Sequence, residues 1–328
     1  MDVEALYAAV FAAPADDGPR LVLADALQER GDPRGEFISL QLQSPRAQRS
    51  ERRMQKLLER HRGSFLRRLQ PVVMPDSAQR WDRGFLSEAA VVLHGEQVDA
   101  PDWATVRKLD VLFSGTPPLE LASPHLRSLQ EISNAPLEVV PVLFAADRPV
   151  SVEAVTLQGP VELQAWPSPE VELIGRARSL PSLSRLTLRY QAPMSALAEW
   201  VWRMPVLERL KSLEFAGAFR GVPLEPLLSV LRQLDTAPAA VVFHASGVKL
   251  RLKRDDGFRS LVVELEPFSG VVWLDSMLWS IPPDSFDEVL ITATQPLEVA
   301  HVAMLKRALK RLKLRSSSLP ASSHSRMK

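Results

Sequence analysis

Apolar residues at three- and four-residue spacing run through the first part of the chain and predict helices there. The spacing first appears at Val3, Leu6, Tyr7, Val10 and Phe11. It continues in the segments 19–30 and 36–43, and in a basic stretch, 46–68. The segment 19–30 is apolar over more than half of its circumference, which predicts packing on two sides. We therefore expect a small all-α domain over residues 1–69.

A second pattern, typical of the strands of leucine-rich repeats, recurs between residues 81 and 305. It is clearest in "LSRLTLRYQ" (Leu183 to Gln191) and "LKSLEFAGA" (Leu210 to Ala218). The fourth positions of the eight copies are Leu109, Ile132, Val155, Leu186, Leu213, Val241, Leu261 and Val289. One step between them is 31 residues and the others are 20 to 28, where leucine-rich repeats run about 20 to 29. The usual asparagine is absent, so the predicted repeats are irregular.

Helical patterns between these strands predict an α/β fold with parallel strands and a helical outer layer. Two such patterns are "SALAEWVWRMPVLERL" (195–210) and "PLEPLLSVLRQLDTAP" (223–238). We expect a leucine-rich-repeat-like solenoid over 70–313, whose first strand begins at Trp81. Alternating residues around Asp255-Asp256-Gly257 predict an antiparallel hairpin over 248–267. The chain then ends in a basic helix, 302–315, and a disordered Ser-rich basic tail, 314–328.

The stretch "RLVLADALQERGDPRGEFISLQLQ" places four carboxylates at spacings of four, three and four. Such spacing could gather acids for a metal or for acid–base chemistry, or it could mark two capped helices at a tight turn. Gly31 occupies the position of a helix-ending glycine, and Asp32 to Gly35 fit a type I turn. A glycine and a proline separate the acids, which favours the turn. The predicted structural residues are Asp25, Gly31, Asp32, Pro33, Gly35 and Glu36.

The same stretch resembles a known module. "DDGPRLVLADALQERGDPRGEFISLQLQ" is similar to the bacterial repeat-companion domain found in many copies in myxobacteria and planctomycetes, which commonly precedes leucine-rich-repeat-like sequence. The match runs from about Leu6 to Gln43 and departs at Ala26, where relatives often carry a bulky residue. The resemblance implies an architecture and carries over no catalytic residue.

Composition and motifs narrow the chemistry further. The chain has no cysteine, which excludes disulfides and thiolate sites. Asp2 and Glu4 oppose a signal peptide, so we expect a cytoplasmic protein with no membrane partner. The six histidines are scattered, and no phosphate-binding, nucleophile or zinc motif is present. We therefore expect no catalytic residue, no metal and no cofactor.

These observations predict a non-enzymatic scaffold that binds a partner protein on the concave face of the solenoid, with the N-terminal helical domain as a cap. Residues that alternate with the buried strand positions would form that face. They are Lys108, Asp110, Thr156, Gln158, Arg185, Thr187, Arg189, Ser212, Glu214, Glu288 and Thr292. The alternative is a nucleic-acid-associated protein that uses the basic helices 46–68 and 302–315. That alternative is weaker, because only Phe65 is interleaved with the basic residues of 46–68 and the ends flank an acidic body.

Overall fold

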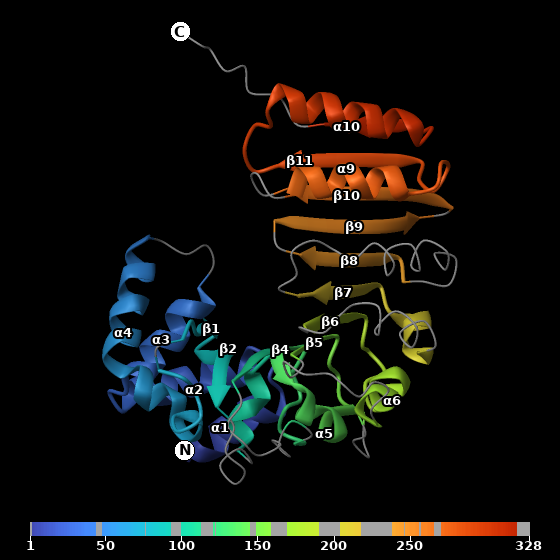
Figure 1. Cartoon of the computed structure of the whole chain (residues 1–328). Helices are drawn as coiled ribbons and strands as arrows, with labels where there is room; N and C mark the ends of the chain where they lie inside the picture. The colour runs from blue at the N-terminus through green and yellow to red at the C-terminus, as the bar shows by residue number, and fades with distance from the viewer. Residues whose placement is uncertain are drawn as a thin grey trace. The chain divides into compact units, whose positions relative to one another are not determined.

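The computed structural model shows an α/β protein with an open, mostly parallel sheet (Figure 1). It describes residues 2–43, 48–75, 77–92, 100–112, 121, 123–144, 149–158, 169–189, 204–217, 238–245, 247–255, 257–265 and 270–319. The chain divides into two compact units. The first holds residues 1–155 with 178–182, and the second holds 156–177 with 183–328.

The first unit begins with four helices, which confirms the helices predicted from the spacing of apolar residues. They are α1 (Val3–Ala12), α2 (Gly18–Glu29), α3 (Pro33–Leu42) and α4 (Gln48–Leu66), followed by the short helix η1 (Arg67–Leu69). The rest of the unit contains β1 (Arg80–Asp82), β2 (Phe85–Val92), η2 (Pro101–Thr105), β3 (Lys108–Leu112), β4 (Glu131–Pro136), η4 (Leu137–Val139) and α5 (Val140–Phe144). Strands β2, β3 and β4 are parallel neighbours, and β5 (Ala154–Gln158) lies where the first unit ends in sequence.

The segment predicted as one strand from Trp81 is instead an antiparallel hairpin of β1 and β2. Arg83 and Gly84 both have positive φ, 50° and 85°, which is the backbone of a two-residue hairpin turn. A Cβ on Gly84 would lie 2.2 Å from Ile38 Cγ1, so only glycine fits where α3 approaches this turn.

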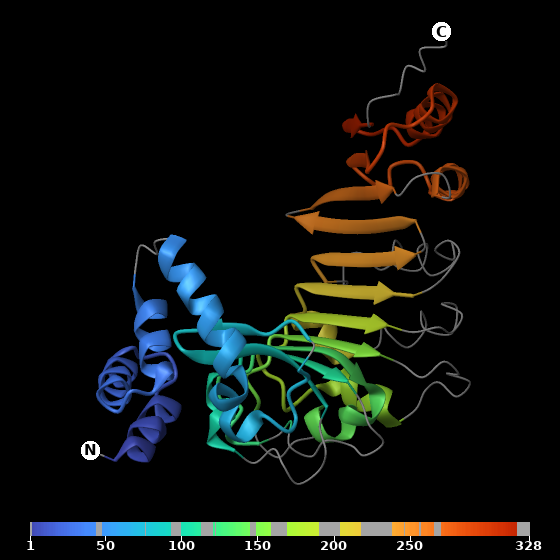
Figure 2. The same ribbon diagram turned by 90° about the vertical axis from the view of Figure 1, so that its left-hand side faces the viewer.

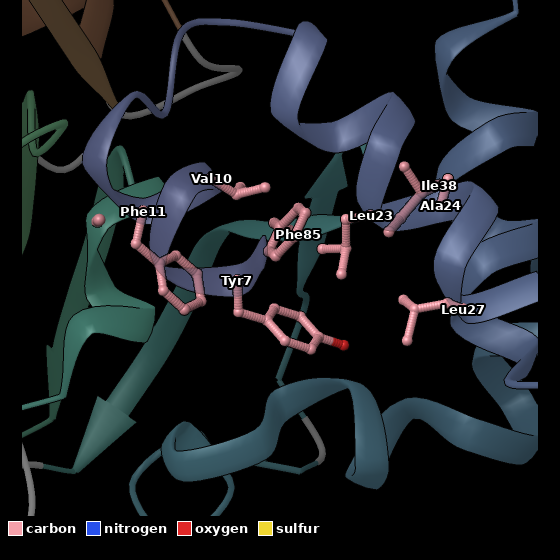
Figure 3. Packing of buried hydrophobic residues seen from close by; sticks show 9 residues of the cluster. Tyr7, Val10, Phe11, Leu23, Ala24, Leu27, Ile38 and Phe85 are labelled. Carbon is pink, nitrogen blue, oxygen red and sulfur yellow. The ribbon is translucent and has the colours of Figure 1, made fainter. Parts of the chain in front are cut away.

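The helices of residues 1–69 share a core with the first strands, so the structure does not show a separate all-α domain. Phe85 of β2 makes edge-on contacts with Tyr7 and Phe11 of α1, with ring centroids 6.3 and 5.9 Å apart. Figure 3 shows Phe85 among these rings and Leu23 of α2. Burying an aromatic ring of this size contributes about 1.5–3 kcal/mol, which ties the helices to the hairpin.

The sequence of α2 predicts packing on two sides, but the structure buries only one side of this helix. Leu23, Ala24 and Leu27 face the core, whereas Leu21 and Val22 are 51% and 44% exposed. The apolar arc of α2 is wider than the surface that α1, α3 and β2 offer it.

The second unit continues the alternation of strands and helices. Its strands after β5 are β6 (Arg185–Arg189), β7 (Ser212–Ala216), β8 (Ala240–Ala245), β9 (Val248–Asp255), β10 (Phe258–Leu265), β11 (Glu288–Ala293) and β12 (Ser316–Ser318). Its described helices are α6 (Pro169–Arg176), η5 (Pro205–Arg209), α9 (Gly270–Ser280) and α10 (Val299–Arg311). The predicted helices over 195–210 and 223–238 lie mostly outside the described residues.

The predicted repeat positions stand in register across the strands of the second unit. The row that crosses β6 to β11 consists of Leu186, Leu213, Val241, Leu252, Leu261 and Val289. All six side chains are buried. In the first unit Leu109 pairs with Ile132 in the same way. The predicted apolar positions of these strands therefore stand opposite one another in the sheet, except that Leu252 of β9 lies between Val241 and Leu261.

The predicted hairpin is β9 and β10, and it lies within the sheet. Strand β9 is antiparallel to both β8 and β10, while β10, β11 and β12 are parallel. Leu250 and Leu252 of β9 occupy buried positions of the sheet, so the reversed strand preserves the core.

The tail predicted as disordered from residue 314 begins instead as β12, beside β11. Ser316–Ser318 pair with Glu288–Leu290, and the Ser316 hydroxyl donates to Glu288 Oε1 at 2.7 Å. A serine-rich composition predicts disorder because it supplies no apolar surface. Here, however, the backbone of the segment satisfies the hydrogen-bonding groups of a sheet edge.

Helices α9 and α10 lie on one side of β10 and β11 (Figure 2). Gly270, at the start of α9, approaches Val248 and Leu265 so closely that a Cβ would lie 2.6 Å from Val248 Cγ2. Helix α10 buries Val302, Leu305 and Leu309. The residues of β9 to β11 that alternate with the buried row thus face away from these helices.

Candidate functional site

The acidic stretch at 25–36 forms a helix end and a helix start. Gly31 has φ of 71°, and the amides of Gly31 and Asp32 donate to the carbonyls of Gln28 and Leu27, which completes a Schellman motif after α2. Asp32 is the N-cap of α3, its Oδ1 accepts from the Arg34 amide at 2.9 Å, and Pro33 takes the first helical position.

The four carboxylates of this stretch do not converge. Asp25 and Glu29 are exposed on α2, whereas Glu36 forms a bidentate pair with Arg53 of α4, with both contacts at 2.6 Å. The pKa of Glu36 is lowered by the hydrogen bonds from Arg53. Among the described residues, no group of three or more metal-binding side chains exists.

We expect that Mg²⁺, Mn²⁺, Ca²⁺ and EDTA leave the thermal stability of the protein unchanged. A specific site would raise Tm by ligand linkage, and its acids would need to share one centre. Differential scanning fluorimetry across a titration of each ion checks this, with Na⁺ at matched ionic strength as control. A saturable rise in Tm with one divalent ion would contradict the structural role.

The motif also supplies a buried cation that holds the helices to the β1–β2 hairpin. Arg34 is 3% exposed, and its guanidinium donates to Phe65 O at 2.6 Å and to Gly84 O at 3.3 Å. It lies 4.6 Å from the centroid of the Phe85 ring. Burial lowers the pKa of Arg34. Such contacts are typical of a structural arginine, since its donors are used on carbonyls and its face on aromatic rings.

Two further arginines complete this arrangement. Arg20 donates to Pro14 O and Asp16 O, both at 2.6 Å, and burial lowers its pKa to about 10. Arg67 lies 3.6 Å from the Tyr7 centroid and 3.0 Å from Asp102 Oδ1. Burial raises the pKa of Asp102 even though Arg67 opposes that shift. These charged groups are engaged within the core of the first unit.

The residues predicted to bind a partner divide between the two units. Lys108 and Asp110 belong to β3 of the first unit. Lys108 Nζ lies 2.6 Å from Glu131 Oε1, and Asp110 Oδ1 accepts a hydrogen bond from Asn134 Nδ2 at 2.6 Å. The other predicted residues belong to the second unit, where Thr156 and Gln158 stand on β5.

Pairing of β6 to β12 assembles the remaining predicted residues into rows. We call the side of these strands opposite the buried row the polar face. Each row crosses the strands in order from β6. The first row is Arg185, Ser212, Ala240, Lys253, Ser260, Glu288 and Ser316, and the second is Thr187, Glu214, Val242, Arg251, Val262, Leu290 and Ser318. The third row is Arg189, Ala216, His244, Lys249, Glu264 and Thr292. The structure therefore brings together the predicted residues of β6, β7 and β11.

Strands β8, β9 and β10 add residues to the polar face that were not predicted from the sequence. Lys249, Arg251 and Lys253 stand on the polar face because β9 pairs inside the sheet. The signal is present in "VKLRLK" (Val248 to Lys253), where every second residue is basic and the others are apolar. Treating the hairpin as a possible interruption of the repeats left these residues out of the predicted face.

Charge is unevenly distributed on the polar face. Five cations stand on β6 and β9, and one carboxylate, Glu214, stands on β7 between them. Glu264 and Glu288 on β10 and β11 give the other end the opposite sign. His244 Nε2 lies 3.0 Å from Glu214 Oε1, and this contact lowers the pKa of Glu214 while burial opposes the shift. The Glu214 carboxylate is therefore held by its neighbours on the face.

The two basic helices turn their apolar sides inward. Helix α4 buries Met54, Leu57 and Phe65, and α10 exposes Lys306, Arg307 and Lys310 on the side away from its buried residues. No helix in the described parts of the chain has both the length and the apolar character to span a membrane. No family model matches the chain, and no curated protein or solved structure matches it significantly.

Proposed function

We propose that this protein is a non-enzymatic scaffold that binds a partner protein on the polar face of its second unit. The single observation that carries the proposal is the register of β6 to β11, which lines up charged and polar side chains on the side opposite the buried row. A row of this length offers many separate contacts, as repeat proteins do on their concave faces.

The proposal includes a leucine-rich-repeat-like solenoid in which the N-terminal helices act as a cap. Strands that recur every 20 to 31 residues and share one buried row support the solenoid. The packing of α1 to α3 on the β1–β2 hairpin supports the cap, since a repeat stack needs a distinct terminal element to cover its apolar end. The resemblance of the 16–43 stretch to repeat-companion domains agrees with this arrangement.

Site-specific photocrosslinking tests where the partner binds. A benzophenone side chain at Thr187 or Thr292 should give a protein adduct in lysate of the source organism, because both positions stand on the polar face. The same group at Ser276, which is exposed on α9, should give none. Adducts of equal yield from all three positions, or adducts with nucleic acid alone, would contradict the proposal.

Charge reversal on the polar face provides the second arm of this test. We expect Arg185→Glu with Arg189→Glu to reduce the adduct at Thr187 at least about tenfold, since opposed charges at an interface cost several kcal/mol. The variant should keep its Tm within a few degrees, because exposed substitutions cost less than about 0.5 kcal/mol. Arg52→Glu on the exposed side of α4 is the matched control.

A further inference from the structure

Strand β9 presents three cations in a line on the polar face. Lys249, Arg251 and Lys253 alternate with Leu250 and Leu252, which are 0% and 1% exposed on the opposite side. Because side chains on one face of a strand repeat every second residue, neighbouring cations are about 6.7 Å apart along β9. The apolar core under Leu250 and Leu252 fixes the spacing of the backbone positions from which the three cations project.

Two of these cations are available for a partner. Lys249 lies 4.0 Å from Glu264 and shares that carboxylate. Arg251 and Lys253 have no ion-pair partner among the residues that the structure describes. The neighbouring imidazole of His244 is occupied by Glu214. Positive charge is therefore unbalanced at Arg251 and Lys253, and the basic row ends at the exposed carboxylate of Asp255 on the same face.

The surroundings of the row restrict the kind of anion that fits. Glu214 on β7 and Glu264 on β10 lie on either side of it, so the basic strip is narrow. Nucleic acids bind to broad basic surfaces and, when single-stranded, stack their bases on aromatic rings. Among the described residues of β6 to β12, Phe258 at the turn end of β10 is the one phenylalanine, tyrosine or tryptophan on the polar face, and it is 38% exposed. A narrow row with one ring beyond its end offers no series of stacking positions, and it fits one extended peptide chain better than a polynucleotide.

We propose that the β9 row binds an extended acidic segment of the partner protein, with carboxylates at alternate positions. An extended peptide repeats its side chains on one side with the same period as β9, so successive carboxylates would lie opposite successive cations. The negative end of the polar face, at Glu264 and Glu288, repels a second acidic stretch and limits the segment to β9. This inference rests on the proposed function and specifies the chemistry of its partner.

Two peptides of equal composition test the spacing. Both are ten-residue fluorescent peptides with three glutamates among serines; one has them at alternate positions and the other has them consecutively. We expect fluorescence anisotropy at low ionic strength to give a Kd at least about tenfold lower for the alternating peptide. Equal affinities would overturn the proposal, and so would tighter binding of a ten-nucleotide single-stranded DNA.

Matched charge removal locates the binding site. Lys249→Gln, Arg251→Gln and Lys253→Gln together should weaken binding of the alternating peptide at least about tenfold, because the two unpaired cations are lost together with Lys249, which shares its charge with Glu264. Lys306→Gln, Arg307→Gln and Lys310→Gln remove the same charge from the exposed side of α10 and should change Kd less than about twofold. Circular dichroism and Tm confirm that both variants are folded.

The outcomes separate this inference from the proposed function. The three β9 substitutions could leave crosslinking from Thr187 and Thr292 unchanged. That result would keep the polar face as the partner surface and overturn the acidic-segment proposal. The protein without charge substitutions could give no crosslink specific to the polar face and still bind the alternating peptide on β9. That result would overturn the protein-scaffold proposal alone. Equal effects of the β9 and α10 variants would overturn the assignment of peptide binding to β9.

Discussion

Replacing Arg34 by methionine is expected to destabilise the first unit by about 3 kcal/mol or more. The change leaves Phe65 O and Gly84 O without their donor inside the core, at about 1–3 kcal/mol each, and removes the cation from the Phe85 ring. Loss of the desolvation cost of the guanidinium offsets part of this. The measurement is the change in the free energy of unfolding from urea denaturation followed by circular dichroism.

Two comparisons make the Arg34 result specific. Arg34→Lys keeps the charge but lacks the planar fork that reaches both carbonyls, so we expect an intermediate loss. Arg52→Met on the exposed side of α4 should change stability by less than about 0.5 kcal/mol. A loss below about 1 kcal/mol for Arg34→Met would mean that aromatic packing alone holds the helices to the hairpin.

Gly35→Ala is expected to destabilise the protein by about 3 kcal/mol, although alanine is the better helix former. An added Cβ would lie 2.6 Å from Ala24 O and 2.7 Å from Gln28 N, both of which are backbone atoms of α2. Helices α2 and α3 would have to separate, which would loosen the core cluster that contains Leu27 of α2 and Ile38 of α3. Thermal and urea unfolding measure the loss.

A second helical glycine supplies the matched control for this prediction. Gly63 lies within α4, and the nearest atom to an added Cβ is the flexible Gln70 side chain at 3.5 Å. We expect Gly63→Ala to stabilise the protein by up to about 1 kcal/mol, from helix propensity alone. Destabilisation of similar size by both substitutions would show that the close approach of α2 and α3 is not the cause.

These two residues show why the stretch at 20–43 contains so many distinctive residue types. Arg20 holds loop carbonyls, Arg34 holds a carbonyl in the last turn of α4 and one in the hairpin turn, and Gly35 lets α3 cross α2 at close range. Gln41 accepts from the Gly84 amide at 2.6 Å and donates to Trp81 O at 3.2 Å. The stretch therefore joins the helices to the β1–β2 hairpin, with the motif residues used on backbone atoms of other segments.

Periodicity predicted the local elements well because it reports which side of an element is apolar. The helical spacing of Tyr7, Val10 and Phe11 placed α1, and the repeat positions placed strands whose buried side chains stand in register within each unit. Glycine and proline also placed the boundary between α2 and α3. Each of these signals acts within a few residues of the chain and needs no knowledge of the neighbours in space.

The polar face was predictable only in part. Alternation along β6, β7 and β11 identifies Arg185, Thr187 and Glu214, for example, as polar-side residues. The contribution of β9 depends on its antiparallel pairing with β8, a choice that the alternation itself leaves open. A hairpin that joins a sheet and one that projects from it have the same sequence pattern.

The sequence by itself determined the helices of the first 69 residues and the buried positions of the repeat strands, because hydrophobic periodicity is a local property. Only the tertiary structure decided what those surfaces contact. It set Phe85 of β2 into the helical core, left Leu21 and Val22 exposed, buried Arg34 under three aromatic rings and turned Lys249, Arg251 and Lys253 onto the polar face. Such outcomes depend on contacts between residues far apart in the chain, and an apolar or charged pattern identifies a surface without identifying its partner.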